Sequence, residues 1–220
     1  MQKKPGKKQQ PKPNQAGKGR PQQQIRIIGG LWKRTPLPVL DAEGLRPTPD
    51  RVRETVFNWL NHLFDGNWSR LAFLDLFAGT GALGFEAASR GAARVVMVEQ
   101  NTPAVRQLEA TKAKLNAAQV SIVRGDALRG AQDMVTRDAD VRFDVIFLDP
   151  PYHHDLLAKS LPVCAQLLAP GGLVYAESEM PLDVDTPPDW LAAWNVVRAD
   201  KAGMVYYHLL QCNTPAGFQA

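Results

Sequence analysis

The residues best suited to chemistry are Asp149-Pro150-Pro151-Tyr152, which directly follow the apolar run 143–148. That run is rich in β-branched and large apolar side chains, which is typical of a buried parallel strand. Two prolines stop the strand, and the Asp149 carboxylate and a turn carbonyl could both accept hydrogen bonds from one NH2 group. Tyr152 could stack on the flat ring that carries this amino group. A simple helix-starting turn with an aspartate cap would look the same, so the preceding strands must decide.

A glycine-rich turn follows the first predicted strand, 71–76, and leads into a predicted helix that begins at Ala82. Gly79, Gly81 and Gly84 have the spacing of a nucleotide-binding turn, in which glycine permits a tight bend and close approach of the ligand. We therefore expect a nucleoside cofactor at this turn. The residues expected to contact it here are Asp75, Phe77, Ala78, Gly79, Thr80 and Gly81.

Acidic residues also end the next two predicted strands. Glu99 follows 94–98 and could accept both ribose hydroxyls of an adenosine, while Asp126 follows 120–124 and could accept the adenine amino group. Gln100 and Ala127 adjoin them and are expected to line the same site. S-adenosylmethionine carries an ammonium and a sulfonium but no phosphate, so this acidic rim favours it. NAD stays open as the alternative, although its pyrophosphate would be repelled by the carboxylate before the turn.

The order of the predicted elements defines the fold class. Strands and helices alternate from residue 71, which indicates an α/β fold with a mostly parallel sheet and helices on both faces. A final strand pair, 194–199 and 204–210, would add an antiparallel edge hairpin. The other predicted strands are 120–124, 143–148 and 173–176, and the helices are 82–90, 102–116, 127–136 and 155–168.

The amino-terminal part carries most of the positive charge. Residues 1–24 contain seven Lys/Arg and no acid, so we expect a disordered basic tail that either favours phosphate backbones or simply aids solubility. Residues 25–39 predict a short hairpin or extended arm. A helix is predicted from Pro49 with Thr48 as its N-cap. Arg51 and Arg53 lie off the apolar stripe of this helix, so we expect both on the surface.

Composition excludes several classes of protein. No apolar run approaches the roughly 20 residues of a membrane span, and no signal-peptide core is present, which favours a cytoplasmic location. Cys164 and Cys212 are far apart in sequence, so we expect free thiols. The four histidines show no ligand spacing with these cysteines, and no metal site is expected.

Taken together, 75–81, Glu99, Asp126 and 149–152 resemble the class I S-adenosylmethionine-dependent methyltransferases that act on an exocyclic amino nitrogen. The stretches 26–30, 46–48 and 51–58 are similar to the bacterial 16S rRNA guanine-N2 methyltransferase family, which modifies guanine 966. This resemblance covers residues 25–212. It implies a Rossmann-like, seven-stranded sheet, S-adenosylmethionine as cofactor, and 16S rRNA or the small ribosomal subunit as partner.

The resemblance also implies roles for residues and regions. The catalytic set would be Asp149, Pro150, Pro151 and Tyr152, and RNA contacts would come from Arg26, Lys33, Arg34, Arg46, Arg51 and Arg53. With the basic tail expected at 1–24 from composition, the predicted organisation is a methyltransferase domain at 25–212, with an arm and helix (25–66) and a catalytic core (71–212), and a second tail at 213–220. We expect a monomer. The alternatives are an amino-methyltransferase for DNA adenine N6 or 23S rRNA, or an NAD-dependent oxidoreductase.

Overall fold

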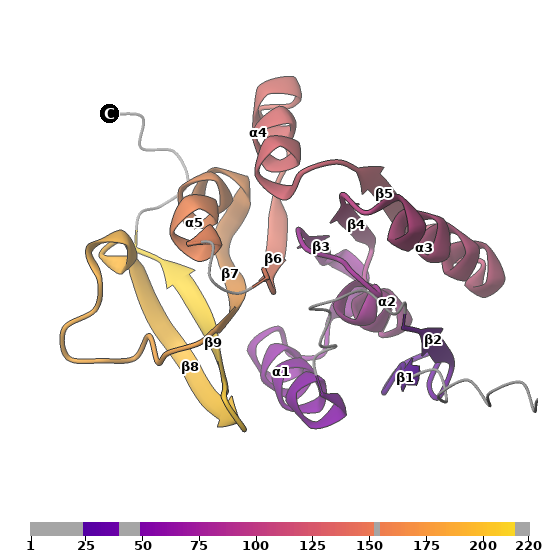
Figure 1. The fold of residues 1–220 in the computed structure, drawn as a ribbon, viewed down its shortest axis with the longest axis horizontal. Helices are drawn as coiled ribbons and strands as arrows, with labels where there is room; N and C mark the ends of the chain where they lie inside the picture. Colours follow the sequence, from indigo (N-terminus) through magenta and orange to yellow (C-terminus); the bar gives the residue numbers. More distant parts are fainter. Residues whose placement is uncertain (1–23, 40–48, 152–154, 214–220) are drawn as a thin grey trace, which may run out of the picture.

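The computed structural model describes residues 24–39, 49–151 and 155–213 and contains one large sheet (Figure 1). The sheet has seven strands in the order β5-β4-β3-β6-β7-β9-β8, of which β3 to β7 are parallel and β9 is antiparallel to both neighbours. This confirms the predicted fold class. The strands are β3 (Ala72–Asp75), β4 (Arg94–Glu99), β5 (Val120–Arg124), β6 (Phe143–Leu148), β7 (Leu168–Ser178), β8 (Trp194–Ala202) and β9 (Val205–Cys212).

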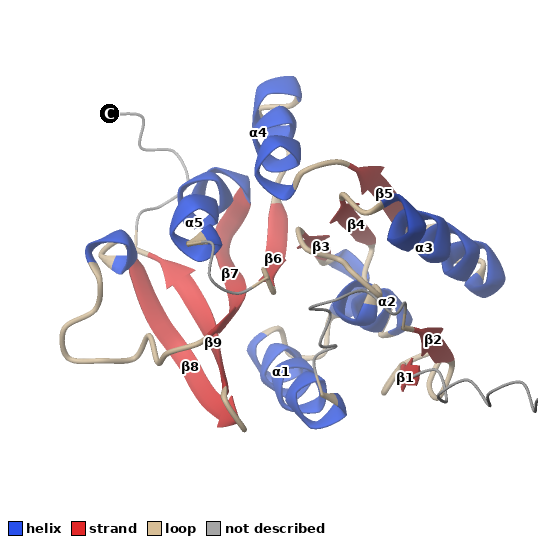
Figure 2. Ribbon diagram, viewed as in Figure 1, coloured by secondary structure: helices blue, strands red, loops and turns tan. Residues whose placement is uncertain are grey.

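Helices cover both faces of the sheet, as predicted (Figure 2). One face carries α1, α2 and α3, and the other carries α4 and α5. The helices are α1 (Asp50–Leu63), α2 (Ala82–Ser89), α3 (Thr102–Leu115), α4 (Ala127–Arg137) and α5 (Leu156–Leu167), with 3-10 turns η1 (Trp68–Arg70) and η2 (Asp189–Leu191).

Most predicted boundaries differ from the observed ones by one or two residues, the end of β8 differs by three, and two starts have a structural explanation. Helix α1 begins at Asp50 with Pro49 as its N-cap, so the helix starts one residue later than predicted, and Thr48 lies outside the described residues. Strand β7 begins at Leu168, five residues before the predicted start. The residues 169–172 contain proline and two glycines and therefore predict a break between helix and strand. The strand nevertheless passes through them, because its register against β6 shifts there and Gly171 adopts a positive φ of 78°.

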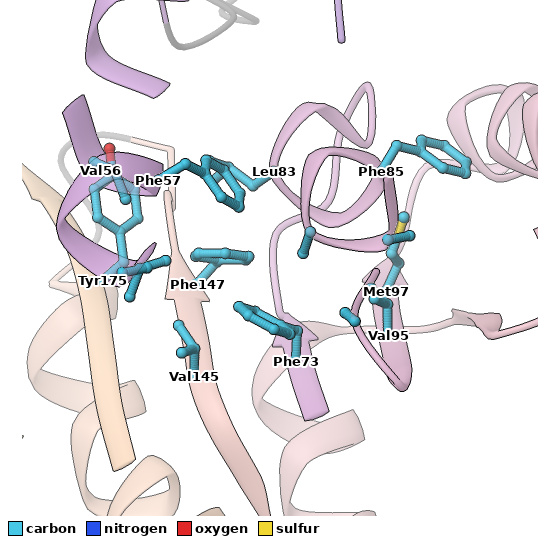
Figure 3. Close-up of a cluster of buried hydrophobic side chains, with 14 of the residues drawn as sticks. Val56, Phe57, Phe73, Leu83, Phe85, Val95, Met97, Val145, Phe147 and Tyr175 are labelled. Carbon is cyan, nitrogen blue, oxygen red and sulfur yellow. The ribbon is translucent and has the colours of Figure 1, made fainter. Parts of the chain in front are cut away.

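A chain of aromatic rings forms the centre of the core between α1 and the sheet (Figure 3). Phe147 of β6 contacts Phe57 of α1, Phe73 of β3 and Tyr175 of β7, with ring centroids 5.8, 5.6 and 6.0 Å apart. All four side chains are fully buried. Aromatic pairs at such distances add stabilisation beyond burial alone, so this cluster fixes α1 over the three strands whose ends carry polar groups.

The predicted hairpin is present as a separate two-stranded sheet. Strands β1 (Gln24–Arg26) and β2 (Pro36–Pro38) pair antiparallel and lie against α2 rather than joining the large sheet (Figure 1). Across the residues that the structure describes, no helix is long and apolar enough to cross a membrane. Both cysteines are free thiols, as predicted, and the described ranges contain no cluster of His, Cys, Asp and Glu suited to a metal ion.

Candidate active site

The order of the strands reverses between β3 and β6. These two strands are neighbours in the sheet, although 67 residues lie between the end of β3 and the start of β6. In open α/β sheets, ligands bind at the carboxyl ends of the strands beside such a switch point. The register places Asp75 beside Met97 of β4 and Phe147 of β6. Glu99 ends β4, and Asp149 follows β6 directly. Three of the predicted acids therefore meet at one edge of the sheet.

The glycines of the turn each have a structural reason. Gly79 and Gly81 have φ values of 51° and 77°, in the left-handed region that glycine adopts at little cost. A Cβ at Gly84 would lie 2.5 Å from the Met97 Cε atom, so a larger residue there would require the Met97 side chain to move. This is the division of roles expected of a nucleotide-binding turn.

Asp75 lies beneath the turn with its side chain 1% exposed, and its Oδ2 atom accepts a hydrogen bond of 3.1 Å from the Gly84 amide. Burial raises the pKa of this carboxyl from 3.8 to about 7, against the opposing effect of hydrogen bonds from the Gly84 and Phe77 amides. A cation bound above the turn would favour the ionised form. Asp75 is thus placed to act on a ligand through its charge, from inside the protein.

Glu99 connects the turn to the start of α3. Its carboxylate accepts 2.8 Å and 2.7 Å hydrogen bonds from the amides of Gly79 and Asn101. Asp126 is exposed and caps α4 by accepting a 2.9 Å bond from the Arg129 amide. The remaining residues predicted to line this site lie around the same edge: Phe77 and Thr80 are half-buried, Ala78 and Ala127 are buried, and Gln100 is exposed.

The end of β6 provides the second half of the site. Asp149 is half-buried, Pro150 is buried and Pro151 is exposed, while Tyr152 lies outside the described residues. The charge of Asp149 contributes to raising the pKa of Tyr175 on β7, after the effects of burial and of Glu177. Asp149 therefore faces β7 as well as the cofactor half of the site.

A fourth carboxylate at this edge was missed by the sequence analysis. Glu177 is 4% exposed near the end of β7, and its Oε1 atom accepts a 2.6 Å hydrogen bond from the Tyr175 hydroxyl. The available signal was its position, because Glu177 follows the predicted strand 173–176 as the other acids follow theirs. A polar residue that ends a central strand can be found from sequence, although its burial cannot.

The predicted RNA-binding cations fall into different environments. Arg26, Lys33, Arg34 and Arg51 are exposed, and Arg26 forms a 3.0 Å surface ion pair with Asp50. The first three line a cavity of about 440 Å³ between the hairpin and α1. Arg46 lies outside the described residues. The cationic face predicted for the hairpin is present, and its contact with RNA stays a prediction.

Arg53 is the exception, because its predicted surface position was wrong. Its side chain is fully buried, donating 2.9 Å and 2.6 Å hydrogen bonds to the Arg26 carbonyl and to Asp50. Burial lowers the pKa of Arg53, while Asp50 and Glu86 oppose that effect. The helical stripe did not reveal this because the hairpin covers a second side of α1. Arg53 holds the hairpin in place and is not available to bind RNA.

Glu86 of α2 is the centre of that attachment. This fully buried carboxylate accepts hydrogen bonds from the amides of Ile28 (2.6 Å) and Gly29 (2.8 Å) and from the Arg90 Nε atom (2.8 Å). At Gly30, φ is 73° and a Cβ would lie 1.9 Å from the Ser89 carbonyl oxygen. The hairpin is therefore fixed to the end of the helix whose first turn follows the glycine turn.

The sheet order, the glycine turn and the acids at the carboxyl edge define the fold of a class I methyltransferase. The chain is 40% identical over 202 residues to Ribosomal RNA small subunit methyltransferase D of Escherichia coli, covering 91% of this chain and 94% of that protein. It belongs to the family described as Conserved hypothetical protein 95, whose model matches residues 25–211. This membership confirms the resemblance seen in the sequence and the assignment of the chain as a methyltransferase.

Solved structures support the same assignment. The structure of yhhF from Escherichia coli superposes with a TM-score of 0.72 at 36% identity, covering 88% of this chain and 99% of that chain. The T. thermophilus 16S rRNA N2 G1207 methyltransferase, in complex with AdoMet and guanosine, gives a TM-score of 0.61 at 23% identity. That match covers 88% of this chain and 50% of the other, and it supports the fold alone.

Proposed function

We propose that this chain transfers a methyl group from S-adenosylmethionine to the exocyclic N2 of a guanine in 16S rRNA, at position 966 in the small ribosomal subunit. Membership of the family and the 40% identity to Ribosomal RNA small subunit methyltransferase D support this function. The observation that carries it is the pair formed by Asp149 and Pro150 at the end of β6, beside the glycine turn. The enzyme acts in the cytoplasm, as a monomer and without a metal ion.

The residues at the switch point fit S-adenosylmethionine. The left-handed bends at Gly79 and Gly81 open the turn for close approach of a ligand. Glu99 and Asp126 accept hydrogen bonds from the nucleoside part, and the charge of buried Asp75 favours a cationic ligand over a pyrophosphate. The bound cofactor supplies an electrophilic methyl group.

Asp149 and Pro150 orient the acceptor. The lone pair of the guanine amino group is delocalised into the ring, so this nitrogen is a poor nucleophile. The Asp149 carboxylate and the Pro150 carbonyl each accept one N2–H, which holds the nitrogen toward the methyl group and stabilises the positive charge that develops on it. The methylated nitrogen then loses one proton, which the Asp149 carboxylate can accept and pass to solvent.

The hairpin and the start of α1 bind the RNA backbone. Lys33, Arg34 and Arg51 are exposed on these elements, and cations attract phosphates with a strength that falls as salt rises. Tyr152 stacks on the target base once it has left its neighbours in the RNA. The rigid attachment of the hairpin to α2 gives this surface a fixed position relative to the glycine turn.

The test is single-turnover methylation of small subunits that lack the modification. Asp149→Ala should lower the rate by about 100-fold or more, the typical loss when a group that stabilises developing charge is removed. Cofactor binding, measured by calorimetry, should stay nearly unchanged. Asp133→Ala, which removes a surface carboxylate on α4, is the matched control and should keep full activity. Full activity in Asp149→Ala would contradict the proposed role.

A further inference from the structure

The acceptor half of the site contains two carboxylates on neighbouring strands. Leu148, the last residue of β6, pairs with Ala176 of β7, and Asp149 and Glu177 are the residues that follow this pair on the two strands. Both carboxylates lie near Tyr175, whose pKa each of them raises. Adjacent strands lie about 4.8 Å apart. Phe147, Tyr175 and Tyr207, which flank these positions, pack in the same core cluster. Asp149 and Glu177 therefore project from the same face, the one that carries α1.

Glu177 is held as a hydrogen-bond acceptor. The Tyr175 hydroxyl donates to its Oε1 atom at 2.6 Å, and the Tyr175 ring is fixed edge-on against Phe147, with centroids 6.0 Å apart. Burial and the two nearby carboxylates raise the pKa of Tyr175 well above 10, so its hydroxyl keeps its proton. Burying a carboxylate costs free energy unless it is well paired. Glu177 is such a buried carboxylate, and it lies at the edge of the sheet where ligands bind.

We propose that Glu177 accepts the N1–H of the target guanine while Asp149 and Pro150 bind its N2 amino group. This inference rests on the proposed function. Guanine presents N1–H and N2–H2 side by side on its Watson–Crick edge, which is the edge that enzymes read on an extruded base. Two neighbouring carboxylates are complementary to that row of donors. In adenine, N1 is an acceptor, so its lone pair would face a carboxylate and be repelled.

Two other arrangements make different predictions. Glu177 could serve only as the buried partner of Tyr175, in which case changing it would affect folding and all substrates equally. Alternatively, Asp149 alone could bind both N1–H and N2–H, which would leave base selection independent of Glu177. Both can be separated from the proposal by changing the hydrogen-bonding character of N1 while keeping the amino group at position 2.

The test uses small subunits reconstituted with 16S rRNA that carries either guanine or 2-aminopurine at the target position. 2-Aminopurine keeps the 2-amino group but has an acceptor at N1. The measured quantity is the ratio of kcat/KM for the two substrates. Glu177→Gln presents an amide NH2 that can donate to this N1, so the preference for guanine should fall by about 10-fold or more, because sites that match hydrogen-bonding groups discriminate strongly.

Two tyrosine variants complete the experiment. Tyr175→Phe keeps the packed ring but removes the hydroxyl that donates to Glu177 Oε1, and it should raise the KM for the guanine substrate. Tyr207→Phe is the matched control, because Tyr207 is equally buried, pairs with Glu177 across β7 and β9, and donates to Asp200 instead. It should leave the preference for guanine unchanged.

The outcomes separate the inference from the proposed function. If the unmodified enzyme does not methylate the guanine subunits, the proposed function fails. If it does, and Glu177→Gln is folded with an unchanged ratio between guanine and 2-aminopurine, the role of Glu177 is overturned. An equal loss on both substrates would show that Glu177 is structural and would also overturn it.

Discussion

Replacing Glu86 with alanine should detach the amino-terminal hairpin from α2 while leaving the large sheet folded. The Glu86 carboxylate is the acceptor for the amides of Ile28 and Gly29 and for Arg90, and it lies 3.9 Å from the buried Arg53 guanidinium. Among the carboxylates of the described ranges, these two amides donate to Glu86 alone. The substitution therefore removes the acceptor of two amides and of the Arg90 Nε atom, and it takes away one of the two carboxylates close to the buried Arg53.

The expected cost follows from these contacts. A hydrogen bond to a charged group contributes about 1.5–3 kcal/mol, and breaking a buried ion pair by removing one partner costs about 3–5 kcal/mol. The contributions are not additive, because the hairpin can separate from α2 and expose the same groups to water. We therefore expect about 3–5 kcal/mol for the attachment as a whole, which at about 1.4 kcal/mol per factor of ten corresponds to a loss of protection of roughly 100-fold to 4,000-fold.

Amide hydrogen exchange measures this directly. In Glu86→Ala, protection of the Ile28 and Gly29 amides should collapse while amides of β6 keep theirs. Glu86→Gln retains one acceptor oxygen and should lose less. Glu109→Ala, at an exposed position of α3, should change stability by no more than about 0.5 kcal/mol. If Ile28 and Gly29 remain protected in Glu86→Ala, the proposed attachment through Glu86 is wrong.

Two further predictions concern buried charges. Because burial raises the pKa of Asp75 from 3.8 to about 7, the unfolded chain releases this proton first as pH rises. The free energy of unfolding should therefore fall as pH rises from about 4 to 7. In Asp75→Asn, the free energy of unfolding measured by urea denaturation should fall less over the same pH range. Arg53→Met should destabilise the protein by about 3–5 kcal/mol, whereas Arg51→Met should leave stability nearly unchanged and reduce the salt dependence of RNA binding. Equal stabilities of these two variants would contradict the assigned burial.

The large sheet could be predicted from sequence because its signals are local. Apolar runs such as 143–148 fix the strands, and Gly79 and Gly81 mark the turn after β3 through conformations that other residues adopt at a cost. The acids that end β3, β4 and β6 could be placed at one edge because parallel strands share their carboxyl ends. What remained hidden was the start of β7, since Gly171 belongs to an irregular strand rather than a turn.

The environment of each charge could not be predicted from sequence. Arg51 and Arg53 both lie off the apolar stripe of α1, yet one is exposed and the other fully buried, because the hairpin docks on only one side of the helix. The burial of Glu86 and Glu177 could not be predicted either. Glu86 is covered by the hairpin, whose Gly29 is 57 residues away in sequence, and Glu177 pairs with Tyr207 of the neighbouring strand β9. Periodicity describes one element at a time and carries no information on a second packing partner.

Helix α2 sets the distance and the angle between the glycine turn and the amino-terminal hairpin. Its eight residues run from the glycine turn to the point where the hairpin is fixed. Each residue inserted into it would move the hairpin by about 1.5 Å and rotate it by about 100° relative to the cofactor turn. The hairpin is therefore not an exchangeable module. A chimaera that borrows residues 24–39 from a relative must also borrow the last turn of α2 and keep the length of that helix.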